Sequence, residues 1–219
     1  MKAVLFDWDG TLADTRQVIV ATFQQVSREV GVSVNTEFIE RRIGTGAAQT
    51  FREILQTAGK PFDDALIKRL LEKKIQVEMG MSSKVKLFPG ALTLLEALQG
   101  KTKIALASMN NRPVIEDLLN TMKIRDCFEV ILTVEGVSKF KPDPEIFLKT
   151  ASKMNCSPAE CVVVEDSIFG VEAAKAAGMD CVAVLTGVYS REELEVANPG
   201  LIVDSLKEKR RILDFIFRK

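Results

Sequence analysis

Five short apolar runs, most of them separated by helical patterns, limit the folds open to this 219-residue chain. The runs are Ala3–Phe6, Lys103–Ala107, Val130–Thr133, Cys161–Val164 and Cys181–Leu185, with Leu201–Val203 as a weaker sixth. Each run is too short for a helix and is typical of a strand that is buried on both faces. Helical patterns follow at Val114–Met122, Glu145–Met154 and Phe169–Ala177. This alternation predicts an α/β fold with a parallel sheet covered by helices on both faces.

The stretch between the first two runs is far longer than a crossover connection needs. It carries helical apolar stripes at Ile19, Phe23, Val26 and Val30 and again at Ile67, Leu71 and Ile75, which we interpret as packing faces of a helical bundle. We therefore predict an inserted helical domain at residues 15–83 and a core domain formed by 1–14 and 84–219. Hinges are expected near Asp14–Arg16 and Gly80–Lys86, before Pro89-Gly90 opens a helix of the core domain.

Composition narrows the class of function. Thirty Lys and Arg balance thirty Asp and Glu, so no long-range field attracts nucleic acid or an anionic membrane. The chain has no histidine, which excludes imidazole triads, histidine metal sites and histidine general bases. Its four cysteines form no CxxC pair, and its first apolar run is too short for a signal peptide or a membrane span. We expect reduced thiols in a soluble cytoplasmic protein, monomeric or weakly homodimeric.

The pentapeptide Asp7-Trp8-Asp9-Gly10-Thr11 follows the first predicted strand. Residues two apart on an extended segment project to the same side, so Asp7 and Asp9 can reach one pocket. Two carboxylates that repel each other there require a cation, and an all-oxygen site suits Mg²⁺. Gly10 permits a tight turn that brings the backbone close to a ligand. Taken alone, the pentapeptide is also compatible with a surface Asp-Gly turn.

Two further groups follow later strands, at the edge of a parallel sheet where ligands bind. Ser108 is followed by Met109 and Asn110 near a helix start, where a hydroxyl and exposed amides bind phosphate oxygens well. For Ser108 alone, an ordinary helix cap is the better explanation. Lys141 is biased towards an extended conformation by Pro142, so its ammonium can be fixed before a helix to neutralise a phosphate. A solvated lysine in a turn is the alternative for that position.

Glu165 and Asp166 follow the run Cys161–Val164 directly. Adjacent carboxylates at the end of a buried strand are costly unless they are paired or bind a metal. Lys141 alone cannot balance four acids, so a divalent ion is the simplest answer. Asp166 or Ser167 can also cap the following helix, which is compatible with a metal role for the other acid.

In this order, DWDGT, Ser108, Lys141-Pro142 and Glu165-Asp166 resemble the motifs of the haloacid dehalogenase superfamily, and the resemblance covers nearly the whole chain. The inserted helices resemble the helical cap found in its phosphoglycolate phosphatases and β-phosphoglucomutases. The resemblance implies a Rossmann-like parallel sheet core with an inserted α-helical cap domain. It also implies a phosphatase that uses Mg²⁺ as cofactor and passes a phosphoryl group from a small phosphorylated metabolite to an aspartate and then to water.

For the acids, the resemblance implies that Asp7 is the nucleophile and also a Mg²⁺ ligand. Asp9 would bind the metal through its backbone carbonyl, which leaves its carboxyl free to protonate the leaving oxygen and then deprotonate the attacking water. Asp166 would bind the metal directly, and Glu165 through water.

For the phosphoryl group, the resemblance implies binding by Ser108 and by the amides of Met109 and Asn110. Lys141 would neutralise both the phosphoryl group and the nucleophile. Thr11 would support the loop and the phosphate.

At some positions this sequence differs from members of the superfamily, and these differences indicate which of their activities to expect. Asp9 and Gly10 argue against a dehalogenase, because a leaving chloride needs no acid to protonate it. Where β-phosphoglucomutases carry a cap histidine, this chain has Ile19, and Gly44–Ala48 lacks the arginine with which they bind a second phosphate. A phosphatase is therefore expected, with a phosphosugar mutase as the alternative. A non-catalytic phosphometabolite-binding protein is a second alternative, although a binder needs no second aspartate.

The cap stretch Ile43-Gly44-Thr45-Gly46 resembles the cap loop of phosphoglycolate phosphatases, and a plain interhelical turn is the alternative. Arg41, Arg42 or Arg52 can bind a substrate carboxylate in bidentate fashion. Phosphoglycolate is thus the first candidate substrate, and a hexose or deoxyhexose phosphate is its competitor.

Overall fold

A six-stranded parallel sheet forms the centre of the computed structural model, which describes residues 1–218. Its strands are β1 (Ala3–Phe6), β4 (Lys103–Ala107), β5 (Val130–Leu132), β6 (Cys161–Glu165), β7 (Asp180–Val184) and β8 (Leu201–Val203), in the order β5-β4-β1-β6-β7-β8. Every neighbouring pair is parallel. The predicted α/β class and all six predicted strands are confirmed, each strand to within one residue at either end.

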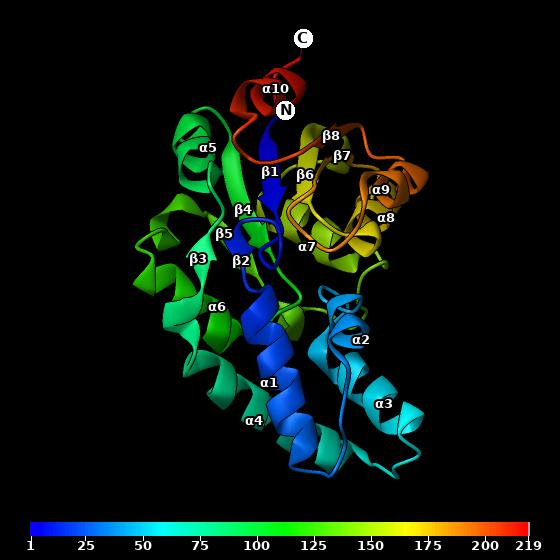
Figure 1. Ribbon diagram of the computed structural model, residues 1–219. Helices are drawn as coiled ribbons and strands as arrows, with labels where there is room; N and C mark the ends of the chain where they lie inside the picture. The colour runs from blue at the N-terminus through cyan, green and yellow to red at the C-terminus, as the bar shows by residue number, and fades with distance from the viewer. Residues whose placement is uncertain (219) are drawn as a thin grey trace.

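Helices cover both faces of this sheet, because alternate strand residues point to opposite sides (Figure 1). Val4 and Phe6 of β1 pack in one core with α5 (Ala91–Leu98), α6 (Arg112–Thr121) and α10 (Lys209–Ile216). Ala3 and Leu5 pack in the other core with α7 (Glu145–Lys153), α8 (Ile168–Ala176) and α9 (Arg191–Ala197). Short 3₁₀ turns lie at Ser82–Lys84, Arg125–Cys127, Val134–Gly136 and Pro158–Glu160.

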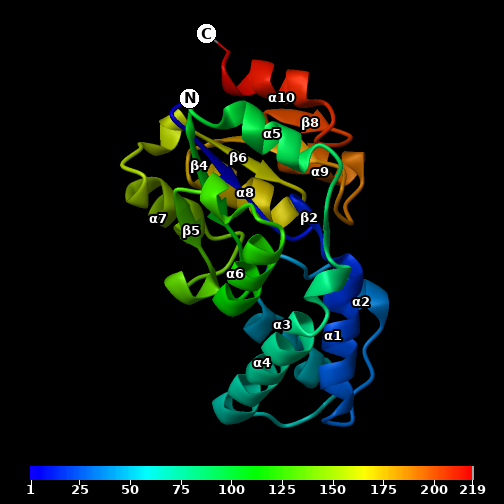
Figure 2. The ribbon, with the colours of Figure 1, turned by 90° about the vertical axis from the view of Figure 1, so that its left-hand side faces the viewer.

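The inserted segment is a helical cap set apart from the sheet domain (Figures 1 and 2). It has a hydrophobic core of its own. It comprises α1 (Arg16–Arg28), α2 (Thr36–Glu40), α3 (Ala47–Thr57) and α4 (Asp64–Met79). Phe23 and Phe51 meet at its centre with ring centroids 4.7 Å apart. The domain limits 15–83 and 84–219 stay a prediction, although all four of these helices begin and end within 15–83.

A small second sheet joins the cap to the core. Its strands β2 (Ala13–Asp14) and β3 (Lys86–Leu87) are antiparallel, and Phe88 donates a backbone hydrogen bond of 2.9 Å to Leu12. The two chain crossings therefore lie side by side, close to where the hinges are expected. The ladder itself was not predicted, because two-residue strands are too short to leave a period-two pattern.

The apolar stripe predicted on the last cap helix is wrong in part. The side chains that α4 buries are Ile67, Leu70, Lys74 and Glu78, while Leu71 and Ile75 are only half-buried. These four also lie on one face of a helix, at spacings of three and four. Two charged residues thus occupy positions where helical periodicity alone predicts apolar ones.

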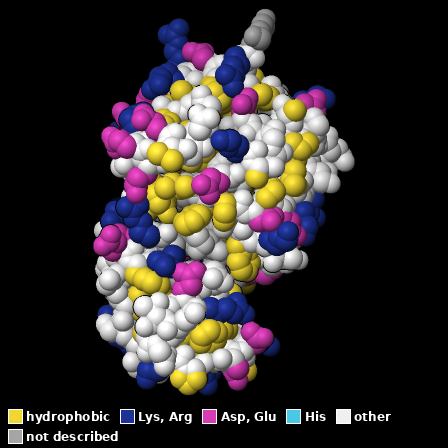
Figure 3. Space-filling model, turned by 90° about the vertical axis from the view of Figure 1, so that its right-hand side faces the viewer, with side chains coloured by type: hydrophobic (Ala, Val, Ile, Leu, Met, Phe, Trp, Pro, Cys, Tyr) yellow, Lys and Arg dark blue, Asp and Glu magenta, His cyan; other side chains and the backbone are white. Residues whose placement is uncertain are grey.

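The remaining structural expectations concern the thiols and the surface. All four cysteines are free, and Cys156, Cys161 and Cys181 are buried. On the face drawn in Figure 3, basic and acidic side chains are interspersed rather than gathered by sign. Within residues 1–218, none of the helices is long and apolar enough to cross a membrane.

Candidate active site

The carboxyl ends of the three central strands bring the predicted motifs together. Asp7 follows β1, Ser108 follows the neighbouring β4, and Glu165 is the last residue of β6 on the other side. Because the strands are parallel and in register, their ends lie at one edge of the sheet. Lys141 reaches this edge from the loop before α7.

Lys141 is fully buried and connects two of the acids. Its Nζ lies 2.7 Å from Asp7 Oδ1 and 2.7 Å from Glu165 Oε1, and it also donates to the carbonyl of Ala107 at 3.4 Å. Burial by itself would lower the pKa of this ammonium, but the charges of the two carboxylates outweigh burial and raise it. The alternative of a solvated lysine is therefore wrong.

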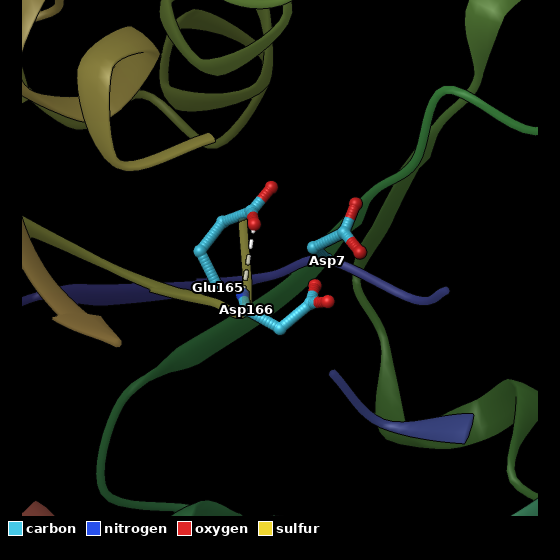
Figure 4. Close-up of side chains that lie close together, drawn as sticks. All are labelled: Asp7, Glu165 and Asp166. Carbon is cyan, nitrogen blue, oxygen red and sulfur yellow. Dashed lines mark hydrogen bonds between the residues drawn. The ribbon is translucent and has the colours of Figure 1, made fainter. Parts of the chain in front are cut away.

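Asp7, Glu165 and Asp166 lie close together (Figure 4), and with Lys141 they form what we call the acidic cluster. The three carboxylates each offer an oxygen within 4.8 Å of the others, and all three side chains are buried. Burial raises the pKa of Asp7 to about 8, against the opposing charge of Lys141. Burial, and then the charges of Glu165 and Asp7, raise the pKa of Asp166 well above its ordinary value.

A divalent cation fits this donor set. Three ionised carboxylates and one ammonium leave a net charge of −2 in a buried space. The donors are all oxygens, as Mg²⁺ prefers. The raised pKa values of Asp7 and Asp166 show how unfavourable ionisation is there without a compensating charge.

Glycines and a hydroxyl shape the space around Asp166. Thr11 donates from Oγ1 to Asp166 Oδ1 at 2.9 Å. A Cβ on Gly10 would lie 2.2 Å from Asp166 Oδ2, and one on Gly187 would lie 2.0 Å from it. Gly10 also has a φ of +87°, in the region that favours glycine. Thr11 therefore holds this carboxylate in the structure, and its proposed phosphate contact stays a prediction.

Both oxygens of Glu165 are engaged within the protein. One accepts from Lys141, and the other accepts three hydrogen bonds of 2.9 Å from the amides of Asp166 and Ser167 and from the Ser167 hydroxyl. Ser167 also accepts from the amide of Gly170 and caps α8. Of the two helix caps considered from sequence, Ser167 is the cap, and Asp166 faces the acidic cluster.

Asp9 belongs to a different network from Asp7. Its Oδ1 accepts a hydrogen bond of 3.3 Å from the side-chain amide of Asn110, which also donates to Glu78 of the cap at 3.0 Å. Burial raises the pKa of Asp9 to about 6; the charge of Glu78 adds to the rise, and that of Lys74 opposes it. The second aspartate can therefore carry a proton close to neutral pH.

The loop after β4 places Ser108, Met109 and Asn110 beside the acids. Ser108 is fully buried, and its hydroxyl accepts the Asn110 amide hydrogen at 3.0 Å. Helix α6 begins later, at Arg112 with Asn111 as its N-cap, so the cap alternative for Ser108 is wrong. Because the Asn110 amide is already engaged, the expected contact of Ser108 and these amides with a phosphoryl group stays a prediction.

A cavity of about 30 Å³ lies between cap and core on the Asp9 side. The core lines it with Asp9, Met109 and Asn110, and the cap with Ile19, Phe23, Arg42, Ile43, Gly44, Gly46, Ala47, Thr50 and Lys74. Gly44 and Gly46 have positive φ values, and a Cβ on Gly46 would lie 3.3 Å from the Phe140 ring of the core. The cap loop therefore faces the core, as a substrate-facing loop requires.

The three candidate arginines all have acidic partners. Arg41 pairs with Glu193 of α9 at 2.9 Å, Arg52 pairs with Asp64 at 2.9 Å, and Arg42 pairs with Glu53. Of the three, only Arg42 lines the cavity. Tyr189 strengthens the contact at Arg41 by donating to its carbonyl at 3.0 Å, so Arg41 joins cap to core.

Sequence reasoning missed Lys74 and Glu78, which form an ion pair that we call the cap pair. Each is 2% exposed, and Lys74 donates to Asn110 Oδ1 at 2.6 Å. A signal existed, because the two are four residues apart on the helical row that begins with Ile67 and Leu70. Oppositely charged residues on an otherwise buried row indicate a pair inside a site.

Comparisons with known proteins agree with this geometry. The family model for haloacid dehalogenase-like hydrolases matches residues 4–184. The chain is 34% identical over 183 residues to "Phosphorylated carbohydrates phosphatase" of Thermotoga maritima, covering 82% of this chain and 83% of the relative. It is 33% identical over 194 residues to "Beta-phosphoglucomutase" of Bacillus subtilis, covering 85% and 84%. It also matches 20% of the length of a longer Arabidopsis thaliana protein, at 34% identity.

A solved structure matches over the full length. A hydrolase from Pseudomonas syringae superposes with a TM-score of 0.90 at 28% identity, and the match covers 99% of each chain. The core sheet and the helical cap are thus shared with a solved hydrolase.

Proposed function

The chain belongs to the haloacid dehalogenase-like hydrolases, and from that membership we propose that it is a Mg²⁺-dependent phosphatase of small phosphate monoesters. Its reaction would pass through an aspartyl-phosphate on Asp7. The observation that carries the proposal is the division of the two buried aspartates between two networks. Asp7 contacts Lys141 in the acidic cluster, and Asp9 contacts Asn110 beside the cavity.

This division matches the two tasks of the reaction. The nucleophile must be ionised; burial raises the pKa of Asp7 to about 8, and the ammonium of Lys141, 2.7 Å away, opposes that rise. The proton carrier must exchange a proton near neutral pH, and a pKa of about 6 suits Asp9 for protonating the leaving oxygen and then accepting a proton from water. In-line placement of the phosphate between them can contribute about 7–11 kcal/mol of barrier reduction.

Mg²⁺ is the proposed cofactor, held by Asp7, Asp166 and the backbone carbonyl of Asp9, with Glu165 contributing through water. When bound, it would supply charge neutralisation and polarisation of the phosphoryl oxygens. Both Glu165 oxygens already accept hydrogen bonds, which supports an indirect role for that residue. Glu165 also fixes Lys141 against the nucleophile.

The loop after β4 and Lys141 are proposed to bind the transferring phosphoryl group. Ser108 and the amides of Met109 and Asn110 would donate to its oxygens, and Thr11 would assist while it orients Asp166. This binding requires the Asn110 amide to leave the Ser108 hydroxyl when substrate arrives. A monomeric or weakly dimeric state and a cytoplasmic location stay predictions from the sequence.

A phosphosugar mutase is the second candidate, because one relative is named β-phosphoglucomutase. Ile19 lines the cavity at the position where the resemblance expects a mutase histidine. An apolar side chain there cannot exchange a proton with a sugar hydroxyl. Incubation with a hexose 1-phosphate and a hexose bisphosphate separates the two: free phosphate supports the phosphatase, and an isomerised sugar phosphate supports the mutase.

Phosphate release from a panel of monoesters, with Mg²⁺ or with EDTA, tests the proposal. We expect Mg²⁺-dependent turnover that Asp7→Asn abolishes. Asp214→Asn, an exposed change of the same kind on α10, should retain turnover. Undiminished activity of Asp7→Asn would refute the nucleophile, and inactivity of the wild type on every ester would favour the phosphometabolite-binding alternative.

A further inference from the structure

The cations beside the cavity are already neutralised. Among the described residues that line it, the positively charged ones are Arg42 and Lys74, both from the cap. Each pairs with a glutamate of its own domain, Arg42 with Glu53 and Lys74 with Glu78. The cavity lies beside Asp9, the proposed proton donor to the leaving oxygen. Its volume of about 30 Å³ holds no more than about one water molecule, so the leaving group of a substrate would enter this space as the cap moves away from the core.

The cap pair is held from several sides. Lys74 donates to Asn110 Oδ1 at 2.6 Å and to Asn111 Oδ1 at 3.5 Å, and its remaining neighbour is a Glu78 oxygen. The other Glu78 oxygen accepts from Asn110 at 3.0 Å. The ammonium donates hydrogen bonds to Asn110 and Asn111 and its charge is balanced by Glu78, so a substrate anion would find no uncompensated positive charge at Lys74.

Arg42 is engaged in a similar way. Its guanidinium pairs with Glu53, donates to the carbonyl of Phe38 at 3.0 Å and lies 3.5 Å from the centre of the Phe38 ring. Glu53 is held in turn by Gln49 at 2.9 Å. Glu53 neutralises the charge of this guanidinium, so a substrate carboxylate would find no uncompensated positive charge at Arg42.

We infer that the leaving group of the substrate is an uncharged, hydroxyl-bearing alcohol of the polyol or sugar class, and that Glu78 sets this specificity by neutralising Lys74. The inference rests on the proposed phosphatase function and names the substrate class for that site. A carboxylate in the cavity would meet Asp9 and Glu78 without an uncompensated cation, in a buried space where an unpaired charge is costly. A hydroxyl meets no such penalty.

The rest of the lining agrees with an uncharged leaving group. Ile19, Phe23, Ile43 and Ala47 present apolar surface, which suits the carbon skeleton of a small alcohol. Asp9 and the amide of Asn110 supply the polar contacts beside them. The sequence favoured phosphoglycolate over a sugar phosphate as the substrate. This inference reverses that preference and favours a phosphate of the sugar or polyol class.

Two substrates of equal size test the inference. 2-Phosphoglycolate and 2-hydroxyethyl phosphate differ only in a carboxylate against a hydroxymethyl group. We expect the wild type to show a kcat/KM at least about tenfold higher for 2-hydroxyethyl phosphate, the discrimination expected when a charged group finds no partner. A kcat/KM for 2-phosphoglycolate equal or higher would overturn the inference.

Variants of the cap pair test the role of Glu78. Glu78→Gln leaves the Lys74 charge uncompensated, so the ratio of kcat/KM for 2-phosphoglycolate to that for 2-hydroxyethyl phosphate should rise about tenfold. The double change Lys74→Gln with Glu78→Gln removes both charges and should return the ratio to the wild-type side. Asp64→Asn, which breaks an exposed cap ion pair, is the matched control and should not move it.

The possible results distinguish a failure of the proposed phosphatase function from a failure of the inferred substrate class. An unchanged ratio in folded Glu78→Gln would overturn the role of Glu78. If that variant fails to fold, Lys74→Gln decides: it leaves Glu78 without its cation, so the ratio should fall below that of the wild type, and an unchanged ratio would overturn the role of the pair. Acetyl phosphate serves as a small phosphoryl donor without a demanding leaving group. If neither it nor the esters are hydrolysed, the proposed function falls and the inference with it. If it is hydrolysed and 2-phosphoglycolate is preferred, only the inference falls.

Discussion

The acidic cluster and the cap pair are both buried groups of charges, and they differ in balance. The acidic cluster holds three carboxylates against one ammonium, whereas the cap pair holds one carboxylate against one ammonium. An excess of buried negative charge is costly without a cation, so the core side of the site is arranged to bind one. The cap pair has no net charge, so it provides no attraction for a charged group of the substrate. We therefore assign chemistry to the unbalanced cluster and substrate selection to the balanced pair.

Removing the proton carrier should have the largest effect, on activity. Asp9→Asn keeps the hydrogen bond with Asn110 possible but cannot exchange a proton, so turnover of an alkyl phosphate should fall about 10²–10⁴-fold. Mg²⁺ affinity, measured by calorimetry, should change little, because the side chain is not a proposed ligand. A comparable loss of Mg²⁺ affinity would contradict the backbone-only role of Asp9.

Removing the one ammonium of the acidic cluster should have the next largest effect, on stability. Lys141→Met leaves Asp7 and Glu165 buried without their cation, which should cost about 3–5 kcal/mol in the free energy of unfolding at neutral pH. Denaturant titration without metal measures it. Lys139→Met, two residues earlier and 72% exposed, is the control and should cost less than about 1 kcal/mol. If both variants lost the same free energy of unfolding, the negative charges of the acidic cluster would not depend on Lys141 for their stabilisation.

Mg²⁺ should stabilise the protein more at high pH than at low pH. The folded pKa of Asp7 is about 8 and that of Asp9 about 6, both above the ordinary value of 3.8. Raised carboxyl pKa values stabilise the metal-free fold below about pH 4 and lose this contribution as pH rises towards about 8. Bound metal competes with the proton on Asp7, a proposed ligand, for the same carboxylate. Mg²⁺ at about 100 times its Kd adds about 2.7 kcal/mol to the free energy of unfolding. The shift in Tm that Mg²⁺ causes should be larger at about pH 8 than at about pH 5.

The opposite pH trend would contradict this account. A shift in Tm that is equal at both pH values would likewise show that Mg²⁺ and protons do not compete for the acidic cluster. Asp166→Asn supplies the control, because loss of a proposed ligand should abolish most of the shift at either pH.

The coupling within the balanced pair should be the smallest of the four effects. Lys74→Gln leaves Glu78 buried without its cation, and the double change with Glu78→Gln restores neutrality. The double variant should therefore be more stable than the sum of the two single changes predicts, by about 0.5–3 kcal/mol in a double-mutant cycle. Strict additivity would show that the two residues are not coupled.

The same contrast explains what the sequence could predict. The acids that follow strands were predictable, because strand ends converge in a parallel sheet and Asp7, Glu165 and Asp166 each lie at one. Lys74 and Glu78 were harder to predict: their helical row with Ile67 and Leu70 is visible in the sequence, but whether that row faces the core depends on how the cap docks. The partners of the arginines likewise depend on tertiary contacts, as the Arg41–Glu193 pair between cap and core shows.

The central claim is that Asp7 accepts the phosphoryl group while Asp9 manages the proton. Acetyl phosphate needs little leaving-group protonation, so Asp9→Asn should still be phosphorylated by it in the presence of Mg²⁺. Water activation would then fail, and the phosphorylated enzyme should accumulate. Mass spectrometry of the acid-quenched, proteolysed variant should find the phosphoryl group on Asp7. A phosphoryl group on another residue, or wild-type turnover of acetyl phosphate with none trapped on this variant, would contradict the account.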